Sequence, residues 1–98
     1  MLFEDIKLVV YVSKSTRGRW PPGPAFVKGA RPMAIRLGVT GALLDDGLGI
    51  LHVVEGASKA VDQFMAFVSH YNGLNSTRVL HEGKRSSRMF KGIAMTKG

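Results

Sequence analysis

The side chains of this 98-residue sequence that are best suited to chemistry are one tyrosine, Tyr11, and three histidines, His52, His70 and His81. A metal centre would need the histidines to converge with a carboxylate, and their spacing does not indicate such a site. His52 lies in an apolar run, where strand alternation places it on the side of a sheet that Tyr11 also faces. We therefore expect His52 to be a hydrogen-bonded core residue beside Tyr11, and His70 to be a solvated residue at a helix end.

The acidic residues do not form a pattern typical of a catalytic site. Asp45 and Asp46 are adjacent on a predicted turn, which makes them poor partners for acid–base work. Glu55 ends a predicted strand, and we expect it to form local hydrogen bonds at the start of the following helix, where a carboxylate is favoured. The glycines do not follow the pattern of a phosphate-binding loop. The sequence therefore predicts a protein that is not an enzyme.

The elements that must position these side chains are organised around residues 35–56. Two short runs rich in branched residues, Val39–Leu44 and Ile50–Val54, predict strands. Between them, Asp45–Gly49 supplies residues that favour a tight turn, so the two runs predict a β-hairpin. Ala57–Tyr71 then predicts a helix with one apolar side, formed by Ala60, Val61, Phe64, Phe67, Val68 and Tyr71.

The first third of the chain predicts a buried strand and then an irregular segment. Ile6–Ser13 is a nearly continuous apolar run, in which Tyr11 faces one side of the sheet and Val10 the other. Lys14–Ala34 contains all 4 prolines, which lack the amide donor that a helix interior uses. We expect a long basic loop around Trp20 and, at most, a shortened helix within residues 24–31.

The last third of the chain predicts two more strands. The first is Thr77–His81, and the second, Phe90–Met95, follows a basic loop over Glu82–Met89. The order of strand, shortened helix, strand, strand, helix, strand, strand is the ferredoxin-like βαββαββ plan. The sequence thus predicts one α+β domain over residues 1–98, with a five-stranded mixed sheet and two helices on one of its faces.

The composition limits the compartment and the class of protein. A hydrophobic fraction of 45% is typical of a folded globule, and the absence of cysteine excludes disulfides and thiolate metal sites. No apolar run approaches the roughly 20 residues of a membrane-spanning helix. The first residues lack the features of a secretory signal. We therefore expect an intracellular protein, cytoplasmic or in an organelle such as the mitochondrion.

Several segments taken together resemble the BLUF family, whose members are blue-light sensors that use FAD. The segments are LVVYVS, VTGALL with its Asp-Gly turn, LxVxEG, VLHEG and RMFxGxxM, in that order. The resemblance implies a flavin between the two helices, with Tyr11 in the place of the tyrosine that gives the excited flavin an electron. It also places His52 where the family has a glutamine, and Ala34 where it has an asparagine that holds the polar edge of the flavin.

Other positions depart from the family pattern as well. Gly73 and Leu74 take the places of an Arg-His pair, and Ile93 that of a tryptophan or similar residue. A side-chain amide offers a donor and an acceptor together to the flavin edge, whereas alanine offers neither. We therefore favour a BLUF-like module that has lost flavin photochemistry, binds no cofactor and serves as an interaction subunit. The alternative is an FAD-binding photoreceptor whose altered pocket uses Tyr11 and His52.

The sheet face away from the helices indicates a partner, because a soluble monomer does not leave a large apolar face in water. We expect a protein partner or a second copy to cover this face through Ile6, Leu8, Val10, Val12, Leu51 and Val53. The net charge of +7 favours an acidic partner, which could be a protein, a lipid surface or RNA. The basic contact residues would be Arg17, Arg19, Trp20, Arg31, Arg85 and Arg88. A weaker alternative is an RNA-binding accessory protein in which Trp20 stacks on bases.

Overall fold

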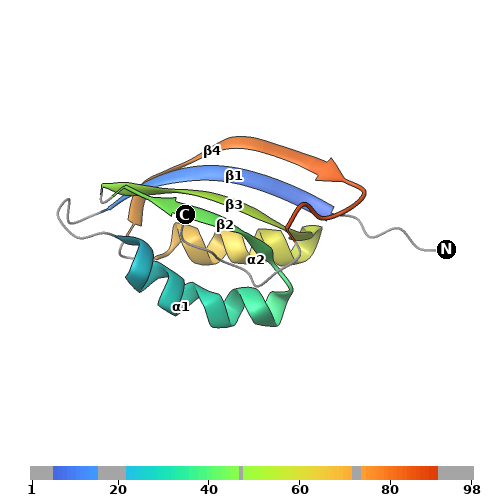
Figure 1. The fold of residues 1–98 in the computed structure, drawn as a ribbon, viewed down its shortest axis with the longest axis horizontal. Coiled ribbons are helices and arrows are strands. Elements are labelled where there is room, and N and C mark those ends of the chain that lie inside the picture. The colour runs from blue at the N-terminus through green and yellow to red at the C-terminus, as the bar shows by residue number, and fades with distance from the viewer. Residues whose placement is uncertain (1–5, 16–21, 47, 72–73, 91–98) are drawn as a thin grey trace.

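A computed structural model of the chain describes residues 6–15, 22–46, 48–71 and 74–90. They form a two-layer α+β domain in which two helices cover one face of a curved sheet (Figure 1). The elements in chain order are β1 (Ile6–Ser15), α1 (Pro22–Leu37), β2 (Thr40–Asp45), β3 (Gly49–Ala57), α2 (Ser58–Ser69) and β4 (Leu74–Arg85). This confirms the α+β class and the ferredoxin-like order of these elements.

The sheet has four strands within the described residues, in the order β2-β3-β1-β4, and every neighbouring pair is antiparallel. The prediction of a mixed sheet is therefore wrong for this part of the chain. The predicted fifth strand, Phe90–Met95, falls almost wholly outside the described residues, and Phe90 itself is not in a strand. We call the sheet face that packs on α1 and α2 the inner face, and the opposite one the outer face.

β4 is longer than the sequence predicts, because its pairing with β1 continues from Ser15↔Leu74 to Ile6↔Arg85. The prediction of a loop over Glu82–Met89 is therefore wrong for its first part. Gly83 and Lys84 have little intrinsic preference for strands, and backbone pairing along the whole of β1 overrides that local signal.

The β2–β3 hairpin forms as predicted, and its turn is held by a side chain. Oδ1 of Asp46 accepts hydrogen bonds from the amides of Leu48 and Gly49, both at 2.9 Å. These bonds hold the pKa of Asp46 below its ordinary value, because they stabilise the ionised carboxylate. The aspartate that predicts a turn in the sequence is thus the residue whose side chain closes the hairpin.

α1 is a full helix of 16 residues, so the prediction of a shortened helix within residues 24–31 is wrong. The loop predicted around Trp20 falls outside the described residues. Pro22 and Pro24 fall in its first turn, where the backbone amides have no partner within a helix and proline is tolerated. Only Pro32 removes an interior hydrogen bond. A buried stripe offsets this cost: Phe26, Ala30 and Ala34 recur every four residues, and each is 0% exposed.

The C-terminal end of α1 and the inner face of α2 complete the core. Gly38, with φ of +73°, ends α1 in the left-handed conformation, and the amide of Val39 donates to the carbonyl of Ala34 at 2.9 Å. α2 buries Val61, Phe64 and Val68 against the sheet, as the apolar stripe predicts. The core therefore lies between the inner face and both helices. None of the described helices is long and apolar enough to cross a membrane.

The close approach of β2 to β3 makes Gly41 a test of this packing. A Cβ at Gly41 would lie 1.8 Å from the carbonyl oxygen of Val53, and that backbone atom cannot move without displacing β3. We expect Gly41→Ala to lower the free energy of unfolding by about 3 kcal/mol, at the upper end of overpacking costs. Calorimetry should show a melting temperature lower by on the order of 15 °C.

Gly29→Ala is the matched control, because a Cβ there meets the Tyr71 ring at an ordinary contact distance of 3.9 Å. Within α1, alanine should stabilise the helix by about 0.5–1 kcal/mol relative to glycine. Equal destabilisation by the two substitutions would show that the strands do not approach each other as described.

Candidate functional site

The candidate site is a tyrosine–histidine pair on the two central strands. Tyr11 of β1 and His52 of β3 are direct partners in the antiparallel register, and both side chains point to the inner face. The phenolic oxygen lies 2.8 Å from Nδ1 of His52, and both residues are 0% exposed. This confirms the prediction of a buried, hydrogen-bonded histidine beside Tyr11.

Aromatic rings from both helices surround His52. Phe26 of α1 and Phe64 of α2 meet the imidazole with ring centroids 6.0 and 5.8 Å away and steep interplanar angles of 85° and 70°. Phe67 and Tyr71 extend this cluster, since their rings lie 6.3 and 5.2 Å from that of Phe26. The pair therefore lies in an apolar, aromatic layer between the sheet and the two helices.

Burial keeps both members of the pair neutral. It lowers the pKa of His52 to about 3 and raises that of Tyr11 far above its ordinary value, because water cannot solvate an imidazolium or a phenolate there. Nε2 of His52 has no hydrogen-bond partner in the part of the chain that the structure describes.

The tautomer of His52 can be assigned from this arrangement. If Nδ1 carried the proton, the Nε2 lone pair would be buried unpaired, at a cost of about 1–3 kcal/mol. With the proton on Nε2, the N–H can point at an aromatic face, which is a weak but favourable contact. We therefore assign Tyr11 as the donor, Nδ1 as the acceptor and Nε2 as the protonated nitrogen.

A second buried polar group, Glu55, lies on the opposite face of β3. Its Oε1 accepts a hydrogen bond from the backbone amide of Phe90, and its Oε2 has no hydrogen-bond partner among the residues described. Thr40 completes this contact by donating to the carbonyl of Phe90 at 3.1 Å and accepting from Arg88 at 3.0 Å. The expectation that Glu55 bonds locally at the start of α2 is therefore wrong, because strand alternation turns it to the outer face.

The segment after β4 also changes the predicted interface. Leu8 on β1 and Thr40 on β2 are both direct strand partners of Glu55, whose carboxylate accepts from the Phe90 amide. Leu8 is buried. Ile6 is buried as well. The other four predicted interface residues, Val10, Val12, Leu51 and Val53, are half-buried. The outer face is thus open over only part of the area that the sequence predicts.

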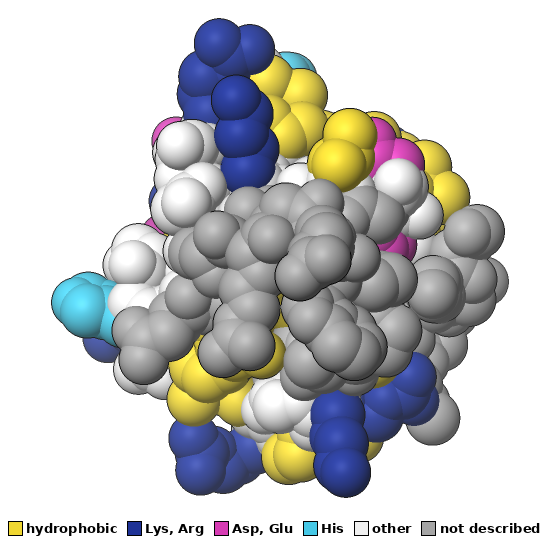
Figure 2. Space-filling model, turned by 90° about the vertical axis from the view of Figure 1, so that its left-hand side faces the viewer, with side chains coloured by type: hydrophobic (Ala, Val, Ile, Leu, Met, Phe, Trp, Pro, Cys, Tyr) yellow, Lys and Arg dark blue, Asp and Glu magenta, His cyan; other side chains and the backbone are white. Residues whose placement is uncertain are grey.

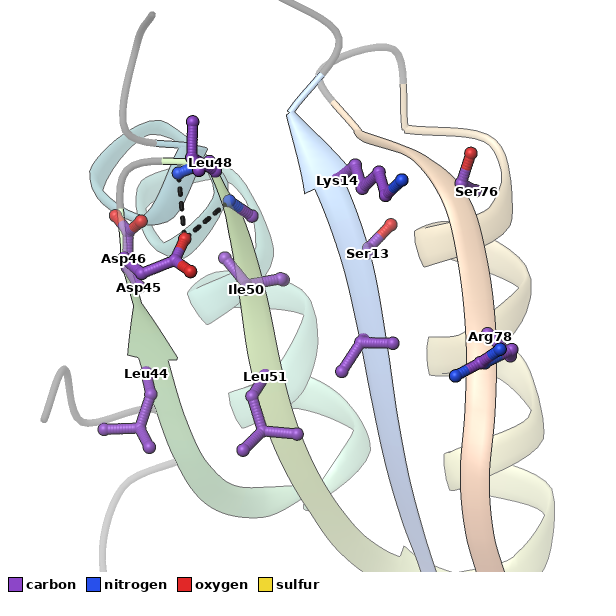
Figure 3. Close-up of a pocket in the computed structure, with 12 residues that line it drawn as sticks. Ser13, Lys14, Leu44, Asp45, Asp46, Leu48, Ile50, Leu51, Ser76 and Arg78 are labelled. Atoms are coloured by element: carbon purple, nitrogen blue, oxygen red, sulfur yellow. Dashed lines mark hydrogen bonds between the residues drawn. The ribbon is translucent and has the colours of Figure 1, made fainter. Parts of the chain in front are cut away.

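A groove of about 1040 Å³ occupies the open end of the outer face. Figure 3 shows Leu44 and Leu51 side by side on its floor, with Arg78 beyond them on β4. Val12 contributes to the same floor, and Lys14 lies at the end of β1. The groove is therefore apolar at its centre and basic along the β1–β4 side.

Only three of the predicted basic contact residues lie within the described part of the chain. Arg17, Arg19 and Trp20 lie outside the described residues. Arg31 is on α1, Arg85 ends β4, and Arg88 donates to Thr40 of β2. Lys and Arg side chains at the end of the molecule in Figure 2 stand at separate places around the rim. Metal ligation has no support either, since no three His, Asp or Glu of the described part converge.

Phe26 is the site residue that sequence reasoning missed. The prolines hid the helix that carries it, although the four-residue spacing of Phe26, Ala30 and Ala34 is itself a helical signal. Ala34, expected at the flavin edge, lies on the same buried stripe. Gly73 falls outside the described residues, as does Ile93, whereas Leu74 is buried at the start of β4.

The chain matches a family model over residues 6–96, and that family is described as BLUF, sensors of blue-light using FAD. This match covers nearly the whole chain, including β1, β3 and both helices. No curated protein matches the chain significantly.

Solved structures show the same fold. A bacterial light-regulated adenylyl cyclase is 23% identical with a TM-score of 0.83, over 94% of this chain and 27% of that one. The BlrP1 BLUF structure is 24% identical with a TM-score of 0.83, over 99% of this chain and 65% of that one. Klebsiella pneumoniae BlrP1 with FMN and cyclic diGMP is 26% identical with a TM-score of 0.82, over 94% of this chain and 25% of that one. The chain thus spans about a quarter of the length of two of these proteins.

The neutral, buried His52 makes stability depend on pH. Its pKa is about 3 in the folded chain against an ordinary value of 6.5, so the unfolded chain takes up the proton first as pH falls. Its contribution is fully present above pH 6.5 and is lost as pH falls toward 3. Between pH 7 and pH 4 we expect the wild type to lose about 3 kcal/mol more stability than His52→Gln does, measured by urea unfolding. Identical losses would show that His52 is not buried as a neutral group.

Proposed function

The chain belongs to the BLUF family, the sensors of blue light using FAD, and we propose that it is a flavin-binding, light-sensing domain with an imidazole in place of an amide. One observation carries this proposal: Nδ1 of His52 bonds to Tyr11, while Nε2 is buried and has no partner among the described residues. A buried polar atom of this kind costs free energy that a ligand atom can recover. The family resemblance puts a flavin between the two helices, where His52 lies.

The residues between α1 and α2 fit a flat aromatic cofactor in their chemistry. Phe26 and Phe64 are apolar rings packed on His52, and a bound ring system would take the place that these side chains now fill against the imidazole. Ala34 supplies only a methyl group, so the polar edge of the ring would be held without a side-chain amide at that position. When bound, a flavin supplies blue-light absorption and, once excited, a one-electron acceptor.

The full length of α1 supports this proposal over the loss of photochemistry that the sequence favours. That hypothesis depended in part on prolines replacing one wall of the pocket, and α1 supplies the wall. Within the site, Tyr11 holds its proton and is hydrogen-bonded to a neutral base. Complete burial of both residues keeps water from the phenol. These residues would therefore position a reduced, protonated tyrosine beside the cofactor.

A cofactor-free interaction module is the second candidate. Phe26, Ala34, His52 and Phe64 are each 0% exposed, so the chain's own side chains fill the space between the helices. Such a module would act through the groove on the outer face, whose floor is apolar. Its partner would be an output domain or a second copy, since similar proteins such as the adenylyl cyclase are much longer than this chain. In both candidates the domain senses or binds and has no catalytic role of its own.

Absorption spectra of the purified protein, taken before and after blue light, separate the two candidates. For a light sensor we expect a flavin band that moves to the red on illumination and recovers in the dark. Tyr11→Phe should keep the band and lose the shift, because it removes the phenol that bonds to His52. A spectrum of protein absorption alone, both after native purification and after incubation with FAD, would leave only the cofactor-free module.

Docking through the outer face is tested by a charge placed at its centre. Val10 is half-buried on this face, where its partner across the strands is Val53. We expect Val10→Asp to dissociate a native assembly in analytical ultracentrifugation, since a carboxylate cannot be desolvated there without a partner. Gln63→Asp, at an exposed position on α2, adds the same charge and should leave the assembly intact. Unchanged assembly of the Val10 variant would exclude this face as the interface.

A further inference from the structure

We propose that the groove on the outer face binds a free fatty acid, whose carboxylate lies at Lys14, Ser76 and Arg78 and whose acyl chain lies across the strands. The groove is on the face of the sheet away from Tyr11 and His52. Fatty-acid binding there does not depend on whether a flavin binds between the helices. The volume of about 1040 Å³ is large enough for a ligand of this size.

The floor of the groove is one row of partners that crosses the whole described sheet. Arg78 of β4 pairs with Val12 of β1. Val12 pairs in turn with Leu51 of β3, which pairs with Leu44 of β2. Three strand spacings make this row about 14 Å long. The row therefore has a cation at one end followed by three branched apolar side chains, and a fatty acid has the complementary order of an anionic head and an apolar chain.

The neighbouring row leaves room beside this floor. Lys14 of β1 pairs with Gly49 of β3, which has no side chain to fill the space. Leu48 in the hairpin turn is 65% exposed, and Leu44 at the far end of the floor is 51% exposed. Apolar side chains that are this exposed lose unfavourable contact with water when an acyl chain covers them.

A β-bulge in β4 brings Ser76 to the same end of the groove as Lys14 (Figure 3). The register shifts so that Ser76 and Thr77 together oppose Ser13. Ser13 bonds to the Thr77 hydroxyl at 2.6 Å, which leaves Ser76 as the extra residue. Ser76 has a φ of +53°, which residues other than glycine seldom adopt. Bulges often re-aim a side chain at a functional site, and this one adds a hydroxyl donor beside Lys14.

The charges around the groove favour a carboxylate at the β1–β4 side. Lys14 and Arg78 are exposed and have no acidic partner in the part of the chain that the structure describes. Asp45 and Asp46 lie on the β2 side, and Asp46 bonds to two amides of the turn, which stabilise its ionised form. These carboxylates repel an anion from that side. The head group is therefore attracted to β1 and β4, and the chain extends toward β2.

Isothermal titration calorimetry with dodecanoate, kept below the concentration at which it forms micelles, tests this proposal. We expect one dodecanoate to bind per chain. Dodecanol has the same acyl length without the charge, and it should bind on the order of a hundredfold more weakly, since it lacks charge-assisted hydrogen bonds to two cations. Acetate, which has the head group without the chain, should show no measurable binding.

Substitutions locate the site. Arg78→Gln should weaken dodecanoate binding about tenfold, because it removes one charge-assisted hydrogen bond. Lys59→Gln removes an exposed charge on α2, away from the groove, and should leave the affinity unchanged. Ser76→Gly should weaken binding about fivefold by removing the hydroxyl. The same substitution should raise the melting temperature, because glycine adopts a positive φ without strain, so weaker binding would not reflect unfolding.

Several results would overturn the proposal. Unchanged affinity in both Arg78→Gln and Ser76→Gly would place dodecanoate elsewhere on the chain. Equal affinity for dodecanol would show that the cations do not bind the head group, and equal affinity for acetate would show that the floor contributes nothing. A chain that sediments as a dimer through this face and binds no dodecanoate would assign the groove to a second copy. Binding to phosphatidylglycerol vesicles without binding of dodecanoate would assign it to a membrane surface.

Discussion

The hydrogen bond between Tyr11 and His52 depends on the register of β1 and β3, which makes the two residues direct partners across the centre of the sheet. A slip of one residue in either strand would turn its side chain to the outer face. The register is constrained at one end by Gly49, where a Cβ would lie 2.4 Å from the carbonyl oxygen of Ser13. The hairpin turn and this close approach therefore determine where the candidate site forms, and the helices then enclose it.

β3 links the site to the other face of the sheet. His52 and Glu55 are three residues apart, and because that number is odd, strand alternation sends them to opposite faces. Each is fully buried, and each retains one polar atom without a hydrogen-bond partner in the described structure. Two such groups on one strand are expensive for a domain of this size. Buried side-chain atoms without a partner are rare in folded proteins, which sets these two residues apart from the rest of β3.

Apolar periodicity and turn chemistry predicted the features that depend on a single element or on two neighbouring ones. The hairpin, the α2 stripe and the burial of His52 beside Tyr11 all come from such local patterns. The predictions that were wrong depend on tertiary contacts. Proline propensity favoured a loop where packing of Phe26 against the sheet and α2 produces a helix. Pairing with β1 likewise extends β4, and Glu55 accepts a hydrogen bond from the backbone amide of Phe90, which is far from it in the sequence.

The site shows how a family fold and its chemistry can separate. Membership of the family fixes the strand register and the two enclosing helices, whereas the group at position 52 decides which hydrogen bonds form between them. An amide that rearranges its hydrogen bonds needs polar partners on both sides, and Ala34 supplies none from α1. An imidazole needs only the phenol, because Nδ1 accepts the hydrogen bond of Tyr11 without a partner on α1. Alanine at position 34 and histidine at position 52 are thus compatible with each other, because the pair across β1 and β3 is complete without a polar group on α1.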